Sequence, residues 1–540
     1  MKIQNVLIVI TSMFDLCIIN QMVTARNRTR RNVERLNRRE RFGPPYNHHN
    51  HEMIGWPIDE SFDSSSSGVP EFDFFDSSNG YHHRNIYSQI AQKVIEINLE
   101  SKPNTNYAKN IILFIGEDLP VSTFKTARLY QQCLGDFCYD EVPKDSILRY
   151  YFQDYAIAKS ECSDSVEPDV ACATTAILTG AKSNKGTISL NDKVKFNSHK
   201  YQPNKIHRLD SIASWAQFDG KRTGLVTSGR VTSPGVSPYY GHTPNYNWQS
   251  DYDMAKNKVF AHGADLASQL INSKTGSNLN VILGGGRRKF LPSHQSRGER
   301  LDRRNLINEW LRSKRDHGEH AYIETKEELP QVCRHTKYLL GLFDLDHLNG
   351  KNHPKLAEMT AAAIKLLDKP NDEGFLLLVH SSKVYPQDDF TEDERQVHQH
   401  IHLMDAIKTA IDMTDASETL IIGTTDHYFR NRKYLFNQLR NDVGEQKYTR
   451  KTDIPEIRTD WDFSTYGTRV TAILNELIGK PEYSEDYCDI RDTGDDAMVF
   501  AYGPYSHLFS GIMQQNYIAY IIGYAACIGD SLQMCDDYYI

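Results

Sequence analysis

The chain has 540 residues, of which 39% are apolar and 24% charged, a composition typical of a globular protein long enough to bury a large core. A mean hydropathy of -0.57 excludes a polytopic membrane protein. The net charge of -8 gives no specific sign of a nucleic-acid-binding protein.

The first 25 residues have the pattern of a secretory signal peptide. Lys2 precedes an apolar run over residues 6–19, which Asp15 interrupts, and small residues for cleavage follow at 23–25. The run is short for a membrane span, and an uncleaved anchor is the alternative. The C-terminal residues lack the hydrophobic tail of a lipid-anchor signal. We therefore expect a secreted, extracellular glycoprotein with Asn27 as its glycosylation site and no membrane span or lipid anchor.

Residues 26–84 have the composition of a disordered N-terminal segment. Residues 26–41 hold eight arginines and two glutamates, and residues 42–80 are rich in His, Asn, Ser and Phe. This basic arm can bind polyanions, be cut by processing proteases or be a solvated tail, and the sequence does not choose among the three.

From about residue 85 to residue 540, short apolar strands alternate with helices. Continuous apolar runs predict strands at 110–116, 223–228, 280–284, 374–379, 419–424 and 497–501. Helical periodicity predicts helices at 121–130, 171–181, 209–216, 264–271, 301–314, 355–367 and 394–413. The alternation predicts a three-layer α/β/α sandwich with a mostly parallel central sheet. It breaks down over about 430–495, which predicts a small insertion lobe.

Eight cysteines lie beyond the signal peptide, and an even number in a secreted chain predicts disulfide bonds. Cys133 with Cys138 and Cys527 with Cys535 are close enough in sequence for local pairs. The full connectivity stays open.

Several strings occur in the order found in alkaline phosphatases. They are NIILFIG at 110–116, VILGGGRR at 281–288, LGLF at 340–343, TDH at 425–427 and VFAYGP at 499–504. Over roughly four fifths of its length the chain resembles the secreted animal type of this family. The resemblance implies a homodimer, which suits a helix over residues 85–99 with apolar residues at helical spacing. It also implies a serine that attacks a phosphate monoester, two zinc ions, a magnesium ion and a supporting arginine.

The nucleophile and the arginine both fall on residues that cannot act. The string Pro168-Asp169-Val170-Ala171 places Val170 where the family has its serine. An isopropyl group has no nucleophilic atom and cannot ligate zinc. Tyr246 stands where the family has the arginine that holds phosphate, and a phenol cannot make the bidentate charged contact of a guanidinium.

The metal positions are degenerate as well. At the three magnesium positions the chain has Ser233, Gly235 and His380, of which glycine offers no side-chain ligand and histidine suits a softer ion. At the leaving-group zinc both family histidines are absent, and the positions read Tyr385, Asp389 and Asp492. Those two aspartates can hold a hard cation or be part of a solvated acidic loop.

Only the serine-side zinc retains candidate ligands, and these are Glu117, Asp426 and His427. Three protein ligands can hold a zinc ion, while a retained Asp-His pair can equally be a structural remnant. We expect at most one weakly bound zinc and no magnesium.

The resemblance and the losses together predict a secreted alkaline phosphatase-like protein that is catalytically inactive. It would act by binding an unknown ligand, anionic or phosphorylated, or a protein partner. The alternative is an active alkaline phosphatase that hydrolyses phosphate monoesters with an altered metal site. A purely structural secreted protein is the third interpretation.

Overall fold

A computed structural model describes the molecule over residues 102–119, 154–198, 205–259, 265–295, 297–348, 352–369, 373–382, 392–427 and 496–531, and at positions 95, 99, 123, 127, 152 and 535. The predicted signal peptide, the basic arm, the insertion lobe and most of the predicted helix at 85–99 lie outside these residues. Asn27, Cys133, Cys138 and Cys488 lie outside them too.

The described residues form a ten-stranded sheet in the order β10-β2-β9-β8-β1-β7-β3-β4-β6-β5. Only β9 is antiparallel to its neighbours, β2 and β8; the other adjacent pairs are parallel. The strands are β1 (Asn110–Gly116), β2 (Asp154–Lys159), β3 (Arg222–Arg230), β4 (Val281–Gly285), β5 (His320–Ile323), β6 (Tyr338–Leu342), β7 (Phe375–Ser381), β8 (Thr419–Thr425), β9 (Ala497–Tyr502) and β10 (Gly511–Gln514).

The described α-helices are α5 (Val170–Thr179), α6 (Ile212–Phe218), α7 (Asp251–Lys256), α8 (Leu266–Asn272), α9 (Lys274–Ser277), α10 (Leu306–Lys314), α11 (Leu356–Leu367), α12 (Glu392–Met413) and α15 (Tyr517–Ala525). Single 3-10 turns occur at Lys205–His207, Ser237–Tyr239, Arg287–Phe290, Lys326–Gln331, Ser506–Leu508 and Gly529–Ser531.

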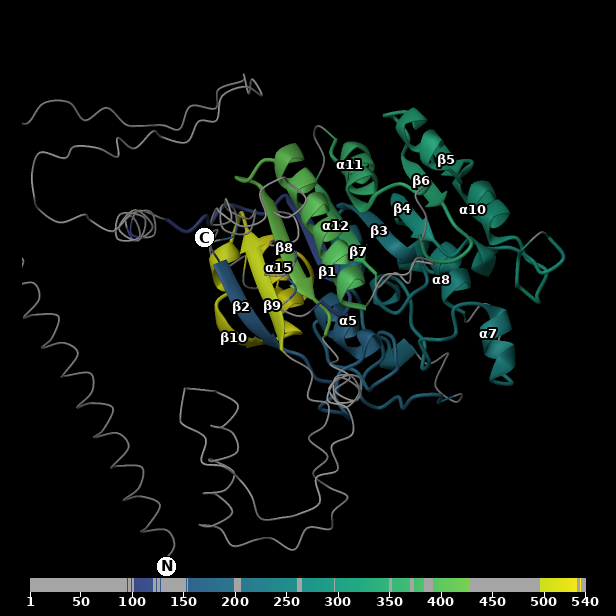
Figure 1. The fold of residues 1–540 in the computed structure, drawn as a ribbon, viewed down its shortest axis with the longest axis horizontal. Helices are drawn as coiled ribbons and strands as arrows, with labels where there is room; N and C mark the ends of the chain where they lie inside the picture. Colours follow the sequence, from purple (N-terminus) through teal and green to yellow (C-terminus); the bar gives the residue numbers. More distant parts are fainter. Residues whose placement is uncertain are drawn as a thin grey trace, which may run out of the picture. The chain divides into compact units, whose positions relative to one another are not determined.

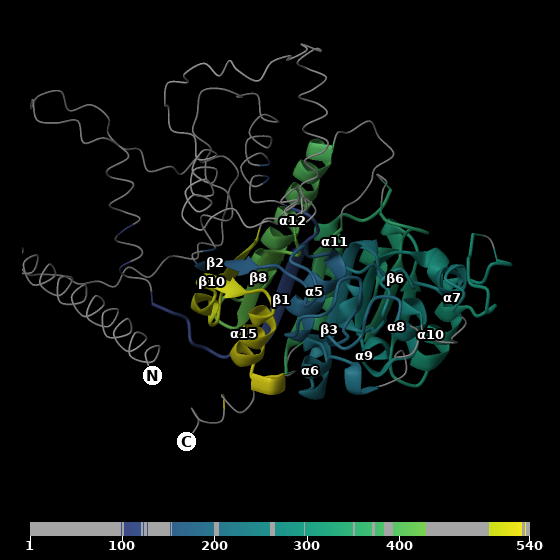
Figure 2. The ribbon, with the colours of Figure 1, turned by 90° about the horizontal axis from the view of Figure 1, so that it is seen from below.

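Helices cover both faces of the sheet because its central strands are apolar on both sides. Every residue of β1 is buried, with Ile111 and Leu113 in one core and Ile112 and Phe114 in the other. The first core is shared with α5, α6, α8, α10 and α15, and the second with α11 and α12. Figures 1 and 2 show α11 and α12 on one side of the sheet and α5, α6 and α8 on the other. The predicted three-layer sandwich is confirmed.

Four strands, β2, β5, β6 and β10, lie outside the predicted runs. In β2 buried and exposed residues alternate, and β5 and β10 are four-residue strands at the two edges of the sheet, so none of these three presents a continuous apolar run. The string LGLF overlaps β6, and its resemblance to the family is the one sign of this strand in the sequence.

Two disulfides lie in the described part of the chain. Cys527–Cys535 is confirmed, while Cys162–Cys172 joins the loop after β2 to the first turn of α5, a pairing the spacing alone did not indicate. Among the described cysteines Cys333 is unpaired and exposed. None of the described helices is long and apolar enough to cross a membrane.

Candidate functional site

The polar residues predicted for the site follow neighbouring central strands, at the end of the sheet where the carboxyl termini of these strands meet. β1 lies between β7 and β8, and Gly116 at its end is in register with Ser381 and Thr425. Glu117 and Asp118 therefore follow β1 beside the residues that follow β8, Asp426 and His427. Parallel strands bring their carboxyl ends together, which is where α/β folds place their sites.

Asp426 is fully buried and is held mainly by the backbone. Its Oδ1 accepts the amide protons of Asp118, at 3.0 Å, and of His427, at 2.6 Å. The His427 Nδ1 lies 3.1 Å from the same oxygen. The Gln515 side-chain amide, two residues before α15, donates to the Asp426 backbone carbonyl at 2.6 Å. The second carboxylate oxygen, Oδ2, has no hydrogen-bond partner.

Asp426 and His427 form a buried ion pair between a carboxylate and an imidazolium. Burial by itself disfavours the imidazolium, but the Asp426 carboxylate outweighs it, and Asp118 and Glu117 add to its effect, so the pKa of His427 rises to about 9. The pKa of Asp426 is lowered although burial opposes this, because His427 and two backbone N–H groups favour the carboxylate. In this arrangement a proton on His427 neutralises the Asp426 carboxylate.

We predict that His427→Gln costs about 3 kcal/mol of unfolding free energy near neutral pH in the presence of chelator, because the pKa of His427 is about 9 folded and 6.5 as a free side chain. A raised folded pKa stabilises fully below the unfolded value, and the effect is lost as the pH rises through 9. The difference between wild type and variant in urea unfolding should therefore shrink between pH 7 and pH 10. The matched control, His317→Gln at an exposed position, should show no such change. A His427 difference that does not vary with pH would contradict the ion pair.

Glu117 is held by residues that follow β7, on the side of β1 opposite to β8 and Asp426. The Ser382 hydroxyl donates to its Oε2 at 2.7 Å, and Gln399 from α12 donates to its carbonyl at 2.8 Å. Its Oε2 lies 3.9 Å from the Nε2 of His380. The sequence analysis does not identify Ser382 or Gln399, although two serines at the end of a buried strand, Ser381 and Ser382, were an available signal.

The predicted zinc ligands Glu117, Asp426 and His427 lie at one edge of the sheet but are not gathered at metal spacing. Among the described residues, the single group whose three ligand atoms lie within 4.8 Å of one another is Cys162, Asp169 and Cys172. Its two sulfur atoms form a disulfide, so it is not a metal site either.

Val170 is the first residue of α5, and the local hydrogen bonds fix its register. Asp169 is the N-cap, and its two carboxylate oxygens accept the amide protons of Cys172 at 2.8 Å and Gly186 at 2.7 Å. Burial raises the pKa of Asp169, while those amides and His427 oppose the rise. The helix N-terminus thus carries its own carboxylate, followed by an apolar side chain.

The predicted magnesium positions lie beside α5, because the Thr174 hydroxyl of that helix donates to the carbonyl of Pro234 at 2.9 Å. Ser233 and Gly235 lie in the loop that follows β3, and His380 is near the end of β7. The Ser233 Oγ is buried without a hydrogen-bond partner. His380 is fully buried, and burial lowers its pKa to about 4 although Asp426 opposes this, so the ring is neutral.

Tyr246, at the arginine position, packs in a small apolar cluster with Ala171, Ile188 and Leu266. Its ring centroid lies 6.3 Å from that of Phe196. It thus extends the apolar surface beside α5 instead of supplying a cation. The predicted positions Tyr385, Asp389 and Asp492 lie outside the described residues.

Comparison with known proteins agrees with this architecture. A family model described as alkaline phosphatase matches residues 108–457. The membrane-bound alkaline phosphatase of Bombyx mori is 29% identical over 81% of this chain and 83% of that protein. The tissue-nonspecific isozyme of Felis catus is 30% identical over 80% of this chain and 86% of that protein.

Solved structures add evidence for the fold. The alkaline phosphatase of Thermus thermophilus, 16% identical, aligns with a TM-score of 0.52 over 82% of this chain and 98% of its own. That of the Antarctic bacterium TAB5, 18% identical, aligns with a TM-score of 0.50 over 79% of this chain and 100% of its own. The ordered strings, the sheet and these matches lead to one conclusion: the chain belongs to the alkaline phosphatase family.

Proposed function

We propose that this member of the family is catalytically inactive and acts by binding. The observation that carries the proposal is Val170 at the first position of α5. Its register is held by the Asp169 cap on one side and by the Cys162–Cys172 disulfide on the other. Phosphoryl transfer through a covalent intermediate needs an oxygen, sulfur or nitrogen nucleophile at that point, and an isopropyl group offers none.

The surrounding residues support the same proposal. Tyr246 cannot neutralise a phosphate as arginine does, and His380 and Gly235 do not supply the oxygen ligands that suit magnesium. Glu117, Asp426 and His427 are not gathered around a common point, and the Oδ1 of Asp426 already accepts two backbone hydrogen bonds. We therefore propose no magnesium and at most one weakly bound zinc, although alkaline phosphatases usually bind both metals.

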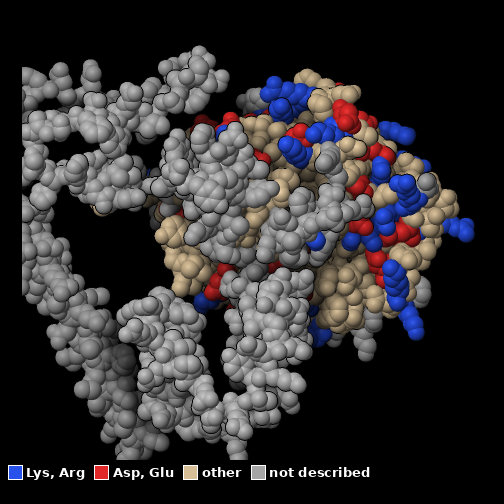
Figure 3. Space-filling model, viewed as in Figure 1, with Lys and Arg blue, Asp and Glu red and all other residues tan. Residues whose placement is uncertain are grey.

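Charge favours a protein partner over a phosphorylated ligand. Asp118 and Glu117 act electrostatically on His427, which in turn acts on Asp169 and Asp426, so one imidazolium faces four carboxylates. Without metal ions such a site repels phosphate. On the face shown in Figure 3, lysine and arginine are interspersed with aspartate and glutamate over the described part, a mixed surface compatible with a protein contact.

The setting of this binding protein is proposed from its sequence. Family resemblance supports a homodimer, and the signal-like first 25 residues with the sequon at Asn27 support a secreted glycoprotein. Disulfides fit an extracellular location.

Steady-state hydrolysis of p-nitrophenyl phosphate tests the proposal against the alternative of an active enzyme with an altered metal site. Protein supplied with zinc and magnesium should hydrolyse the ester at the rate of buffer alone from pH 7 to pH 10. A zinc-dependent rate that a chelator removes would favour the alternative, which the names of the relatives also suggest.

A further inference from the structure

The carboxyl end of β7 is filled by an imidazole ring. His380 lies between β1 and β3, opposite Ile115 and Thr227, and is fully buried. Side chains alternate along a strand, so His380 shares a side with Leu376 and Leu378. Those two belong to the core that includes α5 and α6. The ring therefore points into the layer that contains the N-terminus of α5.

Gly235 provides the space for this ring. A Cβ atom on Gly235 would lie 2.2 Å from the Nε2 of His380 and 2.5 Å from its Cε1, far inside van der Waals contact. The backbone of Gly235 does not have a positive φ, so space, rather than conformation, is what excludes a side chain there. The loop carrying Gly235 is tied to α5, because the Thr174 hydroxyl lies 2.9 Å from the Pro234 carbonyl oxygen.

Both ring nitrogens are turned toward protein. The Nδ1 lies 3.1 Å from the Thr227 Oγ1, which also accepts the amide proton of Gly229 at 2.9 Å. The Nε2 has no hydrogen-bond partner, lies against Gly235, and is 3.9 Å from the Glu117 Oε2. The space between Nε2 and Gly235 is therefore too small for a side-chain atom on residue 235.

We propose that His380 and Gly235 form a matched steric plug that closes the pocket in which family resemblance implies magnesium. The residues present do not fit that ion, because Gly235 has no ligand and an imidazole occupies the space. This proposal deepens the proposed function and rests on it, because both take residues 233, 235 and 380 to be the magnesium positions of the family. It also implies that neither Gly235→Ser nor His380→Ala alone can restore the site: the serine side chain collides with the ring, and loss of the ring leaves no side-chain ligand at either of the two positions.

A double-mutant cycle tests the steric pairing. Gly235→Ala should lower the melting temperature by roughly 3 °C or more in the wild-type background, because a buried ring must move. In a His380→Ala background, where the space is open, the same change should cost much less. The control is Gly241→Ala, whose Cβ would meet Leu266 at 2.8 Å instead. Its cost should be equal in both backgrounds. An equal cost for Gly235→Ala in both would overturn the pairing.

Manganese binding tests whether the plug closes a site. Mn²⁺ prefers oxygen ligands, and its free concentration can be followed by electron paramagnetic resonance. The double variant Gly235→Ser with His380→Glu should remove one more Mn²⁺ per chain from solution than the wild type does, and Gly235→Ser alone and His380→Ala alone should each match the wild type. If the wild type binds Mn²⁺ and His380→Ala abolishes that binding, the ring is a ligand. If the double variant binds no more Mn²⁺ than the wild type, the ring closes no site. Either result would overturn the proposal.

Neither measurement uses turnover. A failed plug therefore leaves the inactive-enzyme proposal standing, and turnover of a phosphate ester would contradict that proposal without affecting the cycle.

Discussion

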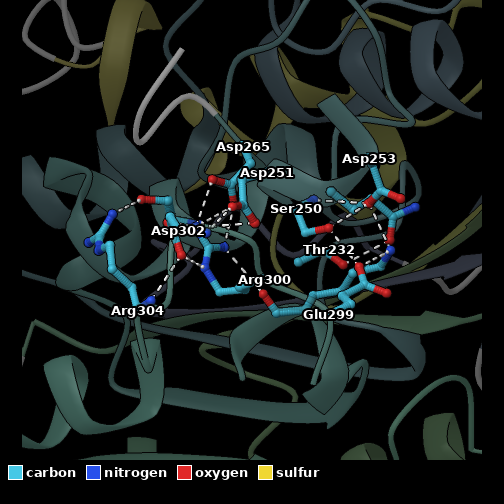
Figure 4. A network of polar contacts seen from close by, with 12 residues as sticks. Thr232, Ser250, Asp251, Asp253, Asp265, Glu299, Arg300, Asp302 and Arg304 are labelled. Atoms are coloured by element: carbon cyan, nitrogen blue, oxygen red, sulfur yellow. Dashed lines mark hydrogen bonds and ion pairs between the residues drawn. The ribbon is translucent and has the colours of Figure 1, made fainter. Parts of the chain in front are cut away.

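Replacement of Arg300 by alanine is expected to lower the free energy of unfolding by about 3–5 kcal/mol, the range found when one partner of a buried ion pair is removed. Arg300 is fully buried and donates hydrogen bonds to the carboxylates of Asp265 and Asp302, as Figure 4 shows. Its two terminal nitrogens lie 2.9 and 3.2 Å from the Asp265 oxygens, and Nε lies 3.1 Å from Asp302. Without the guanidinium, Asp265 would be a fully buried carboxylate lacking its counter-charge.

The position of this clamp explains the size of the effect. Asp265 is also the N-cap of α8, accepting the Ser268 amide proton at 2.9 Å, and Asp302 lies just before α10. Arg300 thus joins the starts of two helices of one layer. Since a typical domain has only about 5–15 kcal/mol of net stability, this loss is a large share of the total.

The control lies four residues away. Arg304 pairs with Glu309, but both side chains are about one third exposed, so Arg304→Ala should cost at most about 1 kcal/mol. Urea unfolding of the two variants beside the wild type provides the comparison. Equal costs for Arg300→Ala and Arg304→Ala would show that the buried clamp adds no more than a surface ion pair.

Val170→Ser alone is expected to leave phosphate-ester hydrolysis at the rate of buffer. Loss of the nucleophile lowers kcat about 10⁶-fold in a serine hydrolase. Restoring activity would therefore require an increase in kcat of about the same size. A serine at position 170 would have a hydroxyl, but the groups that activate it would be missing, since the zinc candidates are not assembled and Tyr246 replaces the arginine.

The rescue experiment needs a folded variant and a matched substitution. Val170→Thr adds a hydroxyl with a shape close to valine, and both variants should keep the wild-type melting temperature within a few degrees because residue 170 is only half-buried. Measurable turnover in Val170→Ser that zinc increases would show that a functional metal site is present after all.

The fold was predictable because its signal is physical and local. Central strands such as β1 and β8 are buried on both sides, so they read as continuous apolar runs bounded by polar residues. The sequence predicts that α10 starts at 301, but it begins at Leu306, where the Asn305 side chain caps it. Arg300 is instead fixed before the helix by Asp265, which is distant in sequence. Such ion pairs leave no periodic pattern.

The site was predictable only as a set of positions. The order of the strand ends predicts that Glu117, Asp426 and His427 lie at the same end of the sheet, but the sequence could not show that His427 lies 3.1 Å from the Asp426 carboxylate. Likewise the sequence shows Gly235 and His380 only as two separate losses. Their contact, across 145 positions of chain, makes them one feature and appears only in three dimensions.

The central claim is that no group at the start of α5 can attack phosphorus, and a rapid-mixing measurement at comparable protein and ester concentrations tests it most directly. A covalent intermediate that forms faster than it breaks down would release p-nitrophenol in an initial burst of up to one equivalent per chain. With zinc and magnesium supplied, the account predicts no burst and a trace that coincides with that of buffer. A burst that scales with protein and disappears with chelator would contradict it.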